Sequence, residues 1–204
     1  LSKKMHLASI WLVALGSNVS ALWILIANSF MQQPVGYAIK NGQAVMTNFW
    51  ALVGNSHVWV QFPHTVLSGF TTGAIFVMVI SVYHLLRKKE LEIFKNSFQI
   101  ANIFGVISII LLILVGHRQA QHMVMVQPMK MAAAEALWES ENPASLSLFT
   151  IGDEKDRDDV FAIRIPRLLS LLAYNRLDGE VKGIRNLQAE YETLYGPGDY
   201  VPSV

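Results

Sequence analysis

The sequence predicts an all-α membrane protein, with a transmembrane bundle of three helices followed by a mostly helical domain outside the membrane. Of its 204 residues, 52% are hydrophobic and only 15% are charged, which is more apolar than an average soluble domain. Three runs of roughly twenty residues lack any formal charge, and each is long enough to cross the hydrocarbon core of a bilayer. We therefore expect three membrane spans.

Charge is distributed unevenly along the chain. Residues 1–117 hold seven Lys/Arg and two Asp/Glu, whereas residues 118–204 hold nine and thirteen. An acidic second part argues against nucleic acid as a partner and fits a domain in water. The absence of cysteine excludes disulfides, thiolate metal sites and iron–sulfur clusters. Because the chain starts at Leu1 rather than Met, we expect it to be a piece of a longer polypeptide.

The first predicted span covers about residues 6–30 and follows Lys3 and Lys4. Its polar residues Ser17, Ser20 and Asn28 fall on broadly one side of a helix. Such side chains usually bond to a backbone carbonyl or join neighbouring helices. The alternative interpretation is a hydrated path for protons along that face.

The segment 31–56 that follows is polar and contains the helix breakers Pro34, Gly36, Asn41 and Gly42. Within it, the residues from Ala44 to Val53 are predicted to form a short helix lying at the membrane interface.

The second predicted span, about residues 59–86, carries one histidine, His64, near its first end. Ser68 and Thr72 lie one and two turns further on, with Gly69 and Gly73 beside them. Small side chains around an imidazole would leave a groove for a flat macrocycle whose iron takes the ring nitrogen. The alternative is that the two glycines form a contact between helices while His64 is only hydrogen-bonded near the interface.

A basic hinge from Arg87 to Lys95 precedes the third predicted span, about residues 98–117. The positive-inside rule places the side of the membrane with more Lys and Arg in the cytoplasm. That side holds six of the basic residues in the first part of the chain, and only Lys40 lies in the opposite short loop. His64 is then expected near the outer face, and residues 118–204 on that face.

The outer segment is predicted to be folded rather than a linker. Met123 to Trp138 favours a helix interrupted at Pro128. Phe161 to Ile165 alternates like a short strand, and the apolar pattern continues from Leu168 to Tyr174. Ile184 to Tyr195 is predicted to be an amphipathic helix.

Three stretches together resemble a known family. They are ALWILIANSFMQQPVG (residues 21–36), FPHT followed by SGFTTGA (62–74), and QPMKMAAAEALWE (127–139). In this order they are similar to the large, haem-bearing subunit of cytochrome bd-type quinol oxidases. The resemblance covers essentially the whole chain and identifies it as a central fragment, with three of the family's nine spans and the short form of its quinol loop.

This resemblance implies a respiratory terminal oxidase that oxidises quinol and reduces dioxygen to water. It implies that His64 is the axial ligand of a low-spin haem b iron through which electrons enter. A further haem b and a haem d are expected in the intact subunit, held by residues outside this chain. In the bacterial or archaeal cytoplasmic membrane, the fragment would be multi-pass, with residues 118–204 forming the extracytoplasmic quinol-binding loop.

The resemblance also assigns residues to quinol and to protons. Lys130 and Glu135 match the family's quinol-oxidising residues, and Gln127 is expected beside them. Ser20 and Asn28 match polar residues that line the family's proton path. Five positions apart on a helix, Lys130 and Glu135 would lie about 140° apart, so they could flank one ring only if the helix is distorted or the ring reaches its edge.

The expected partners are the remainder of the same subunit, a second large membrane subunit, small accessory subunits, membrane lipid and quinol. One departure from the family is that Gly116 and His117 follow the third span where members carry an acid. Two other interpretations are a haem b membrane anchor of another quinol-linked oxidoreductase and a non-catalytic assembly subunit. Such anchors usually hold haem with histidines from two spans, whereas only His64 lies well within a span here.

Overall fold

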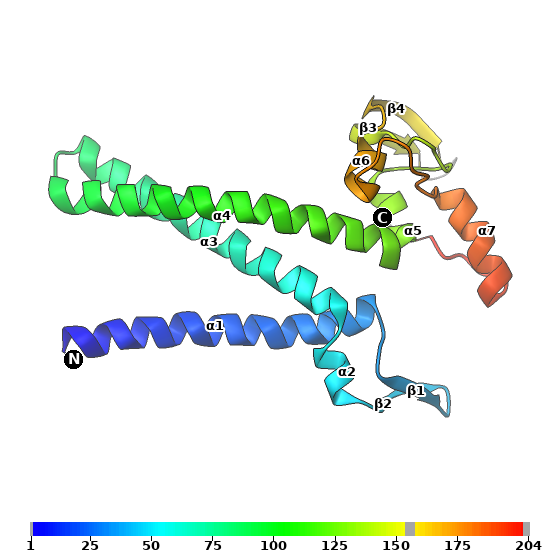
Figure 1. Ribbon diagram of the computed structural model, residues 1–204, viewed down its shortest axis with the longest axis horizontal. Coiled ribbons are helices and arrows are strands. Elements are labelled where there is room, and N and C mark those ends of the chain that lie inside the picture. The colour runs from blue at the N-terminus through cyan, green and yellow to red at the C-terminus, as the bar shows by residue number, and fades with distance from the viewer. Residues whose placement is uncertain (1, 154–157, 202–204) are drawn as a thin grey trace. The chain divides into compact units, whose positions relative to one another are not determined.

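The computed structural model describes residues 2–153 and 158–201. It consists of two units, which we call the apolar unit (Leu1–Gln119) and the polar unit (Ala120–Val204). Figure 1 shows long helices joined by a small hairpin and a short helix in the apolar unit, and short helices with a β-hairpin in the polar unit. The boundary between the units falls within the last of the long helices.

The long helices of the apolar unit are α1 (Lys3–Gln32), α3 (Ser56–Leu86) and α4 (Leu91–Val126). All three are long and apolar enough to cross a membrane, so the prediction of three membrane helices is confirmed. Many of their large apolar side chains are exposed, as Leu12 and Ile100 show at 70% exposure each. At 1.5 Å per residue, α4 is about 54 Å long and exceeds the hydrocarbon core of a bilayer.

The connection from α1 to α3 differs from the prediction. Instead of one helix from Ala44 to Val53, it forms a hairpin of β1 (Tyr37–Lys40) and β2 (Gln43–Met46), followed by the short α2 (Phe49–Val53). Asn41 and Gly42 at the turn both have positive φ, of 52° and 74°. An Asn-Gly pair in this conformation favours a tight antiparallel hairpin, and this local preference outweighs the weak helical pattern of Ala44 to Met46.

The turn between α3 and α4 is shorter than the predicted hinge. It covers residues 87–90, and α4 begins at Leu91, so Glu92 and Lys95 are helical. A glutamate in the first turn of a helix is favoured by the helix dipole. The two helices meet directly after the turn, where the His84 ring on α3 stacks on Phe94 of α4 with centroids 4.1 Å apart.

Small residues set the close contacts within the apolar unit. A Cβ at Gly105 of α4 would lie 3.1 Å from the Cβ of Ala74 on α3. Near the other end of α3, Asn55 donates to the carbonyls of Ser29 and Gln33 at 3.2 and 2.9 Å, which ties α3 to the end of α1. Helices in lipid approach closely through such small and amide side chains because lipid tails offer no hydrophobic driving force between them.

The polar unit contains α5 (Pro128–Ala134), α6 (Leu168–Tyr174) and α7 (Ile184–Tyr195). It also contains the antiparallel hairpin of β3 (Leu146–Asp153) and β4 (Asp158–Ile165). The helix predicted from Ile184 to Tyr195 is confirmed with the same bounds, and the break at Pro128 coincides with the start of α5. The predicted strand is the second half of β4, whereas the pattern of β3 did not reveal it.

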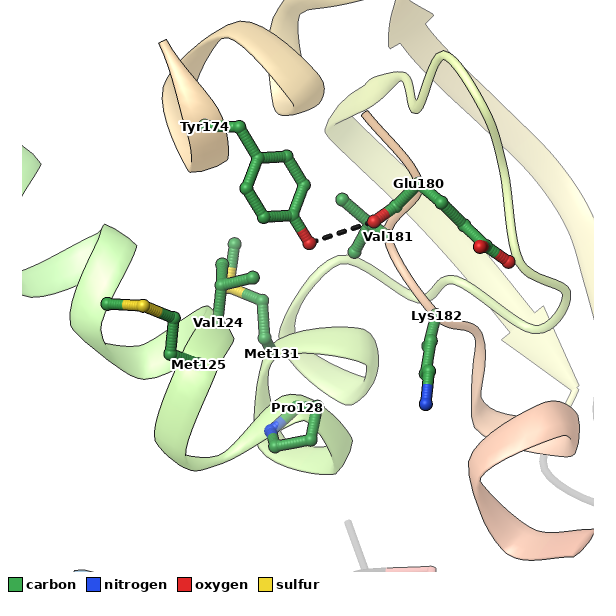
Figure 2. A pocket seen from close by; sticks show the side chains of 8 residues that line it. All are labelled: Val124, Met125, Pro128, Met131, Tyr174, Glu180, Val181 and Lys182. Carbon is green, nitrogen blue, oxygen red and sulfur yellow. Dashed lines mark hydrogen bonds between the residues drawn. The ribbon is translucent and has the colours of Figure 1, made fainter. Parts of the chain in front are cut away.

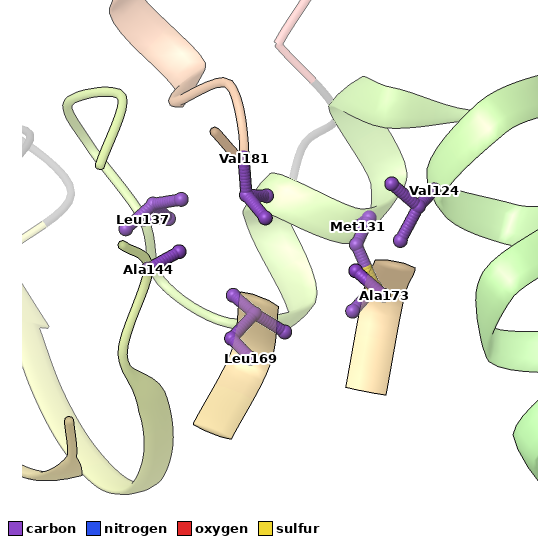
Figure 3. Close-up of a cluster of buried hydrophobic side chains, with 7 residues drawn as sticks. All are labelled: Val124, Met131, Leu137, Ala144, Leu169, Ala173 and Val181. Carbon is purple, nitrogen blue, oxygen red and sulfur yellow. The ribbon is translucent and has the colours of Figure 1, made fainter. Parts of the chain in front are cut away.

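Helix α5 lies between two clusters of buried apolar side chains. Met131 faces the first cluster, shown in Figure 3 with Val124, Leu137, Ala144, Leu169, Ala173 and Val181. Met129 and Ala132 face the second, together with Ile184 and Leu187 of α7. A short helix buried on two sides is held rigidly, so its remaining side chains are presented at defined positions.

The start of α7 crosses the segment after α5 at backbone distance. Ile184 donates to the carbonyl of Leu137 at 2.8 Å, and Arg185 donates to that of Trp138 at 3.0 Å. Gly183 lies so close that a Cβ there would be 2.2 Å from the carbonyl carbon of Glu139. The crossing therefore needs a residue without a side chain.

Candidate functional site

His64 lies on α3, directly after Pro63, and its ring packs against α4. A Cβ at Gly116 would be 3.1 Å from its Cε1 and 3.4 Å from its Nδ1. The Nδ1 atom is buried and has no hydrogen-bond partner among the described residues. A buried polar atom without a partner costs free energy, and the Nδ1 of His84 on the same helix is in the same state.

Gly69 and Gly73 of α3 do not lie beside His64. Gly69 and Gly73 line an apolar cavity of about 780 Å³ with residues of α1 and α4, and His64 does not line it. The reason is geometric, because positions five and nine residues along a helix lie about 140° and 180° around its axis. Among the described residues, nothing approaches either glycine within 4 Å of where a Cβ would be, so they form no close contact between helices here.

The surroundings of His64 fit an iron-bound group in their donor chemistry. An imidazole nitrogen is the usual protein ligand of haem iron, and this ring has a buried nitrogen in need of a partner. The described residues form no cluster of three or more His, Cys, Asp or Glu side chains that could hold a metal ion alone.

The polar residues of α1 divide into two kinds. Ser17 donates to the carbonyl of Val13 at 2.9 Å, and Asn18 donates to that of Ala14 at 2.8 Å, as expected for polar side chains inside a membrane. Ser20 is exposed and Asn28 is half-buried. Neither of these two side chains makes a hydrogen bond within residues 2–153 and 158–201, so their polar atoms are available to water or to other helices.

Lys130 and Gln127 line one cavity of the polar unit. Its volume is about 320 Å³, and its other walls are Val126, Met129, Tyr191 and Tyr200. The two tyrosine rings are nearly perpendicular, with centroids 5.9 Å apart. Burial is the main cause that raises the pKa of Tyr191, and the neighbouring Tyr195 and Glu190 raise it further, so this phenol is neutral at physiological pH. The cavity combines a cation, an amide and aromatic faces.

Glu135 is placed elsewhere, at the C-terminal end of α5. Its Oε2 accepts a hydrogen bond from the backbone N–H of Ser147 in β3 at 3.0 Å, and it does not line the cavity of Lys130. Burial raises the pKa of Glu135, while the Ser147 N–H and the charge of Arg164 act to lower it. Helix α5 is not distorted in a way that brings Lys130 and Glu135 together, so they face two sides of the same element.

A second cavity of the polar unit contains none of the predicted site residues. Its volume is about 230 Å³, and Figure 2 shows the residues around it. Apolar side chains from α4 and α5 face a polar side on which the hydroxyl of Tyr174 donates to the carbonyl of Glu180 at 2.8 Å. That hydrogen bond satisfies the phenol within the fold, and Glu180 and Lys182 also line this cavity.

Three residues next to the predicted site were missed by the sequence analysis. Tyr191 and Tyr200 meet Lys130 only in the folded chain, although their spacing to Pro197 and Gly198 indicates a turn after α7. Arg164 lies in β4, in the half that was predicted to be a strand, and its charge inside an otherwise apolar stretch was the signal that could have found it.

Comparison with known proteins places the whole chain in one group. The family model described as cytochrome bd terminal oxidase subunit I matches residues 1–204. The chain is 49% identical over 205 residues to cytochrome bd ubiquinol oxidase subunit 1 of Bacillus subtilis (strain 168), covering 100% of this chain and 44% of the relative. It is 43% identical over 193 residues to cytochrome bd-II ubiquinol oxidase subunit 1 of Escherichia coli (strain K12), covering 93% and 38%.

One solved structure of a bd oxidase is also similar to this chain. The bd oxidase from Geobacillus thermodenitrificans matches 92% of this chain and 43% of its own with a TM-score of 0.79 and 29% sequence identity. The chain thus spans less than half the length of each of these relatives.

Proposed function

The chain belongs to the cytochrome bd terminal oxidase subunit I family, and we propose that it is the central part of a subunit that oxidises quinol and reduces dioxygen to water. The observation that carries this proposal is the similarity along all 204 residues. In the complete reaction, two quinols give up four electrons and four protons, and one dioxygen takes up four of each to form two waters. This chain would contribute the quinol side of that reaction.

His64 is proposed as the axial ligand of a low-spin haem b. Its imidazole can supply the nitrogen that haem iron takes, and the similarity to the family along the whole chain supports this role. A haem bound there would supply one-electron redox chemistry. The ligands of a second haem b and of a haem d would lie in the rest of the subunit. Ser20 and Asn28, whose polar atoms are free of hydrogen bonds within the described residues, are proposed to line a proton path.

Helix α5 is proposed as the element that contacts quinol. The Lys130 ammonium and the Gln127 amide, in a cavity lined with aromatic rings, suit a ring oxygen on which negative charge develops. Glu135 suits the other requirement, which is an acceptor for a hydroxyl proton, because burial raises its pKa toward the range in which a carboxylate can take up and release protons. Ring binding and proton acceptance would then occur on two sides of α5.

The membrane placement follows from charge. We propose that the turn at residues 87–90 lies in the cytoplasm, and that residues 118–204 lie on the outer face of a bacterial or archaeal cytoplasmic membrane. The exposed apolar side chains of the three long helices fit contact with lipid, with the remainder of the subunit and with a second large membrane subunit. Small accessory subunits would complete the enzyme.

An optical spectrum and one substitution test the haem assignment. We expect the reduced-minus-oxidised spectrum of the intact oxidase to show b-type and d-type bands, and His64→Leu to remove the low-spin b band while the protein still inserts into the membrane. His84→Leu is the matched control, since this ring on the same helix only stacks on Phe94. A full low-spin band in His64→Leu would end the assignment. In the unmutated protein, b bands alone would favour a haem b anchor, and no haem band would favour an assembly subunit.

Replacement of Lys130 tests the quinol site. We expect Lys130→Ala to slow quinol-driven oxygen consumption by about tenfold or more, with all haem bands retained and with little effect when an artificial donor bypasses the loop. Lys182→Ala is the control, because this exposed lysine pairs with Glu190 outside the cavity. Equal losses with both donors would assign Lys130 to folding instead.

The orientation can be tested because the chain contains no cysteine. In intact cells, a membrane-impermeant maleimide should label Arg176→Cys and should leave Lys89→Cys unlabelled until the membrane is opened. The reverse pattern at both positions would overturn the orientation.

A further inference from the structure

Arg164 is the centre of the charged network in the polar unit. From β4, its Nη1 donates to Glu141 at 2.9 Å, and its Nη2 donates to the carbonyl of Ala136 at 3.0 Å and to Asp159. Asp159 is held in turn by the indole N–H of Trp138 at 2.8 Å. The guanidinium thus connects β4 to the residue that directly follows Glu135.

Glu135 is hydrogen-bonded to the hairpin of β3 and β4 at the position of Arg164. Its carboxylate accepts from the N–H of Ser147, and Ser147 is the residue opposite Arg164 in the register of β3 and β4. Two contacts therefore place Arg164 beside Glu135, one through the partner strand and one through the carbonyl of Ala136. The charged groups that surround Glu135 in the described part of the chain are Arg164, Asp159 and Glu141, with Lys130 on its own helix.

The charge of Arg164 opposes the effect of burial on the pKa of Glu135. Burial favours the neutral form of Glu135, and Arg164 is the cation that favours the carboxylate. Two further carboxylates share that guanidinium. Without Arg164, Glu135 would keep its proton to higher pH.

We infer that Arg164 is a positioning residue for quinol oxidation, which holds Glu135 in place and keeps it ionised so that it can accept a proton from the quinol ring. The inference rests on the proposed function. In the step concerned, the O–H bond of the quinol breaks and its proton passes through bridging water to Oε1 of Glu135, because Glu135 does not line the cavity of Lys130 and its Oε2 accepts from the Ser147 N–H. The bonding electron pair stays on the ring oxygen, and the two electrons of the ring would leave one at a time to the haems of the intact oxidase.

The pH dependence of the quinol-driven rate separates this role from simple bracing of the hairpin. We expect Arg164→Gln in the intact oxidase to lower the rate about tenfold near pH 6, which corresponds to a shift of the acidic limb by about one pH unit toward higher pH. At pH 8.5, the loss should shrink to about twofold. Arg164→Lys keeps the charge and should leave the acidic limb near that of the unmutated enzyme.

A double substitution tests whether Arg164 acts through Glu135. If it does, adding Arg164→Gln to Glu135→Gln should cause no further pH-dependent loss. The control for an arginine-to-glutamine change is Arg176→Gln, since this exposed side chain makes no ion pair in the described residues.

The outcomes are distinguishable. A loss in Arg164→Gln that is equal at every pH and equal with a bypass donor would show bracing and overturn the inference, as would an unchanged rate at every pH. An acidic limb shifted by about one pH unit in Arg164→Lys would also overturn it, and this variant serves if Arg164→Gln fails to fold. Failure of the proposed function would appear separately, as an unmutated enzyme that lacks quinol oxidase activity.

Discussion

The two units bury different kinds of side chain, although they belong to one chain. In the polar unit, the fully buried residues include Leu137, Leu169 and Leu187, which is how a domain in water stabilises itself. In the apolar unit, many buried positions are small or polar, such as Ala74 and Ser81, while large apolar side chains face outward. Large apolar side chains such as leucine are therefore buried in the core of the polar unit, whereas many of them face outward in the apolar unit.

The two units also differ in how completely each buries its own apolar side chains. The polar unit has its own clusters of buried apolar residues. Two of its backbone segments also cross in close contact at Gly183. The apolar unit leaves a cavity of about 780 Å³ between its three helices, open to further helices or lipid. Four predictions for the intact, detergent-solubilised oxidase follow, from the largest expected effect to the smallest. The first three compare matched positions in the two units, and the fourth concerns Glu135 in the polar unit.

The largest difference is expected for glycine-to-alanine substitutions. Gly183→Ala places a methyl group 2.2 Å from a backbone carbon of Glu139, so we expect it to cost more than about 4 kcal/mol and to unfold the polar unit. Gly69→Ala meets nothing within 4 Å in the described residues and should be tolerated. Hydrogen–deuterium exchange of peptides from each unit measures both. Loss of assembly in Gly69→Ala would reveal another span packed on that face.

Leucine-to-alanine substitutions should differ next. Leu169 is 0% exposed, so Leu169→Ala should destabilise the polar unit by about 2–5 kcal/mol through lost burial and a residual cavity. Leu114 on α4 is 60% exposed, and Leu114→Ala should change stability by less than about 1 kcal/mol. Pulse proteolysis in urea gives both values, and equal costs at the two positions would contradict the assignment of Leu114 to a lipid-facing surface.

Two buried serines provide a finer comparison. Ser170 accepts from the N–H of Ala144 and donates to the carbonyl of Gly179, both at 2.6 Å. Ser170→Ala leaves that buried N–H without a partner and should cost about 1–3 kcal/mol. Ser81 only donates to the carbonyl of Val77 on its own helix, so Ser81→Ala should cost less than about 0.5 kcal/mol. A similar cost for both would show that Ser81 bonds to a helix outside this chain.

The smallest effect is expected for Glu135→Gln, and its sign depends on pH. Burial raises the pKa of Glu135 in the fold, so the folded state binds this proton more tightly than the unfolded chain does. That stabilisation is complete below the ordinary pKa of a glutamate and is lost as pH rises through the raised value. The amide keeps the acceptor for Ser147, so at pH 8 Glu135→Gln should be as stable as the parent or more stable by less than about 0.5 kcal/mol, and the difference should vanish at low pH. Thermal unfolding at both pH values measures it, and a clear loss of stability at pH 8 would contradict the dominance of burial.

Local patterns predicted much of the fold. Long runs without charge predicted the three membrane helices, because length and hydropathy alone decide whether a helix can span a bilayer. The apolar period from Ile184 to Tyr195 predicted α7 with its observed bounds. The hairpin of β1 and β2 was missed although Asn41 and Gly42 were recognised as breakers, since the turn type that their backbone angles form was not considered. Strand β3 was missed because its pairing partner, β4, lies beyond a turn and decides its conformation.

The sequence by itself determined the membrane character of the chain and the likeness to its family, and it singled out His64, Lys130 and Glu135 as candidate site residues, since these follow from composition and from motifs. Only the tertiary structure decided which groups surround them. It turned His64 toward Gly116 rather than toward Gly69 and Gly73, and it separated Lys130 from Glu135. It also brought Arg164 beside Glu135 from a strand about thirty residues further along the chain. The physical reason is that burial and the neighbours of a charge depend on contacts between distant segments, which no local pattern contains.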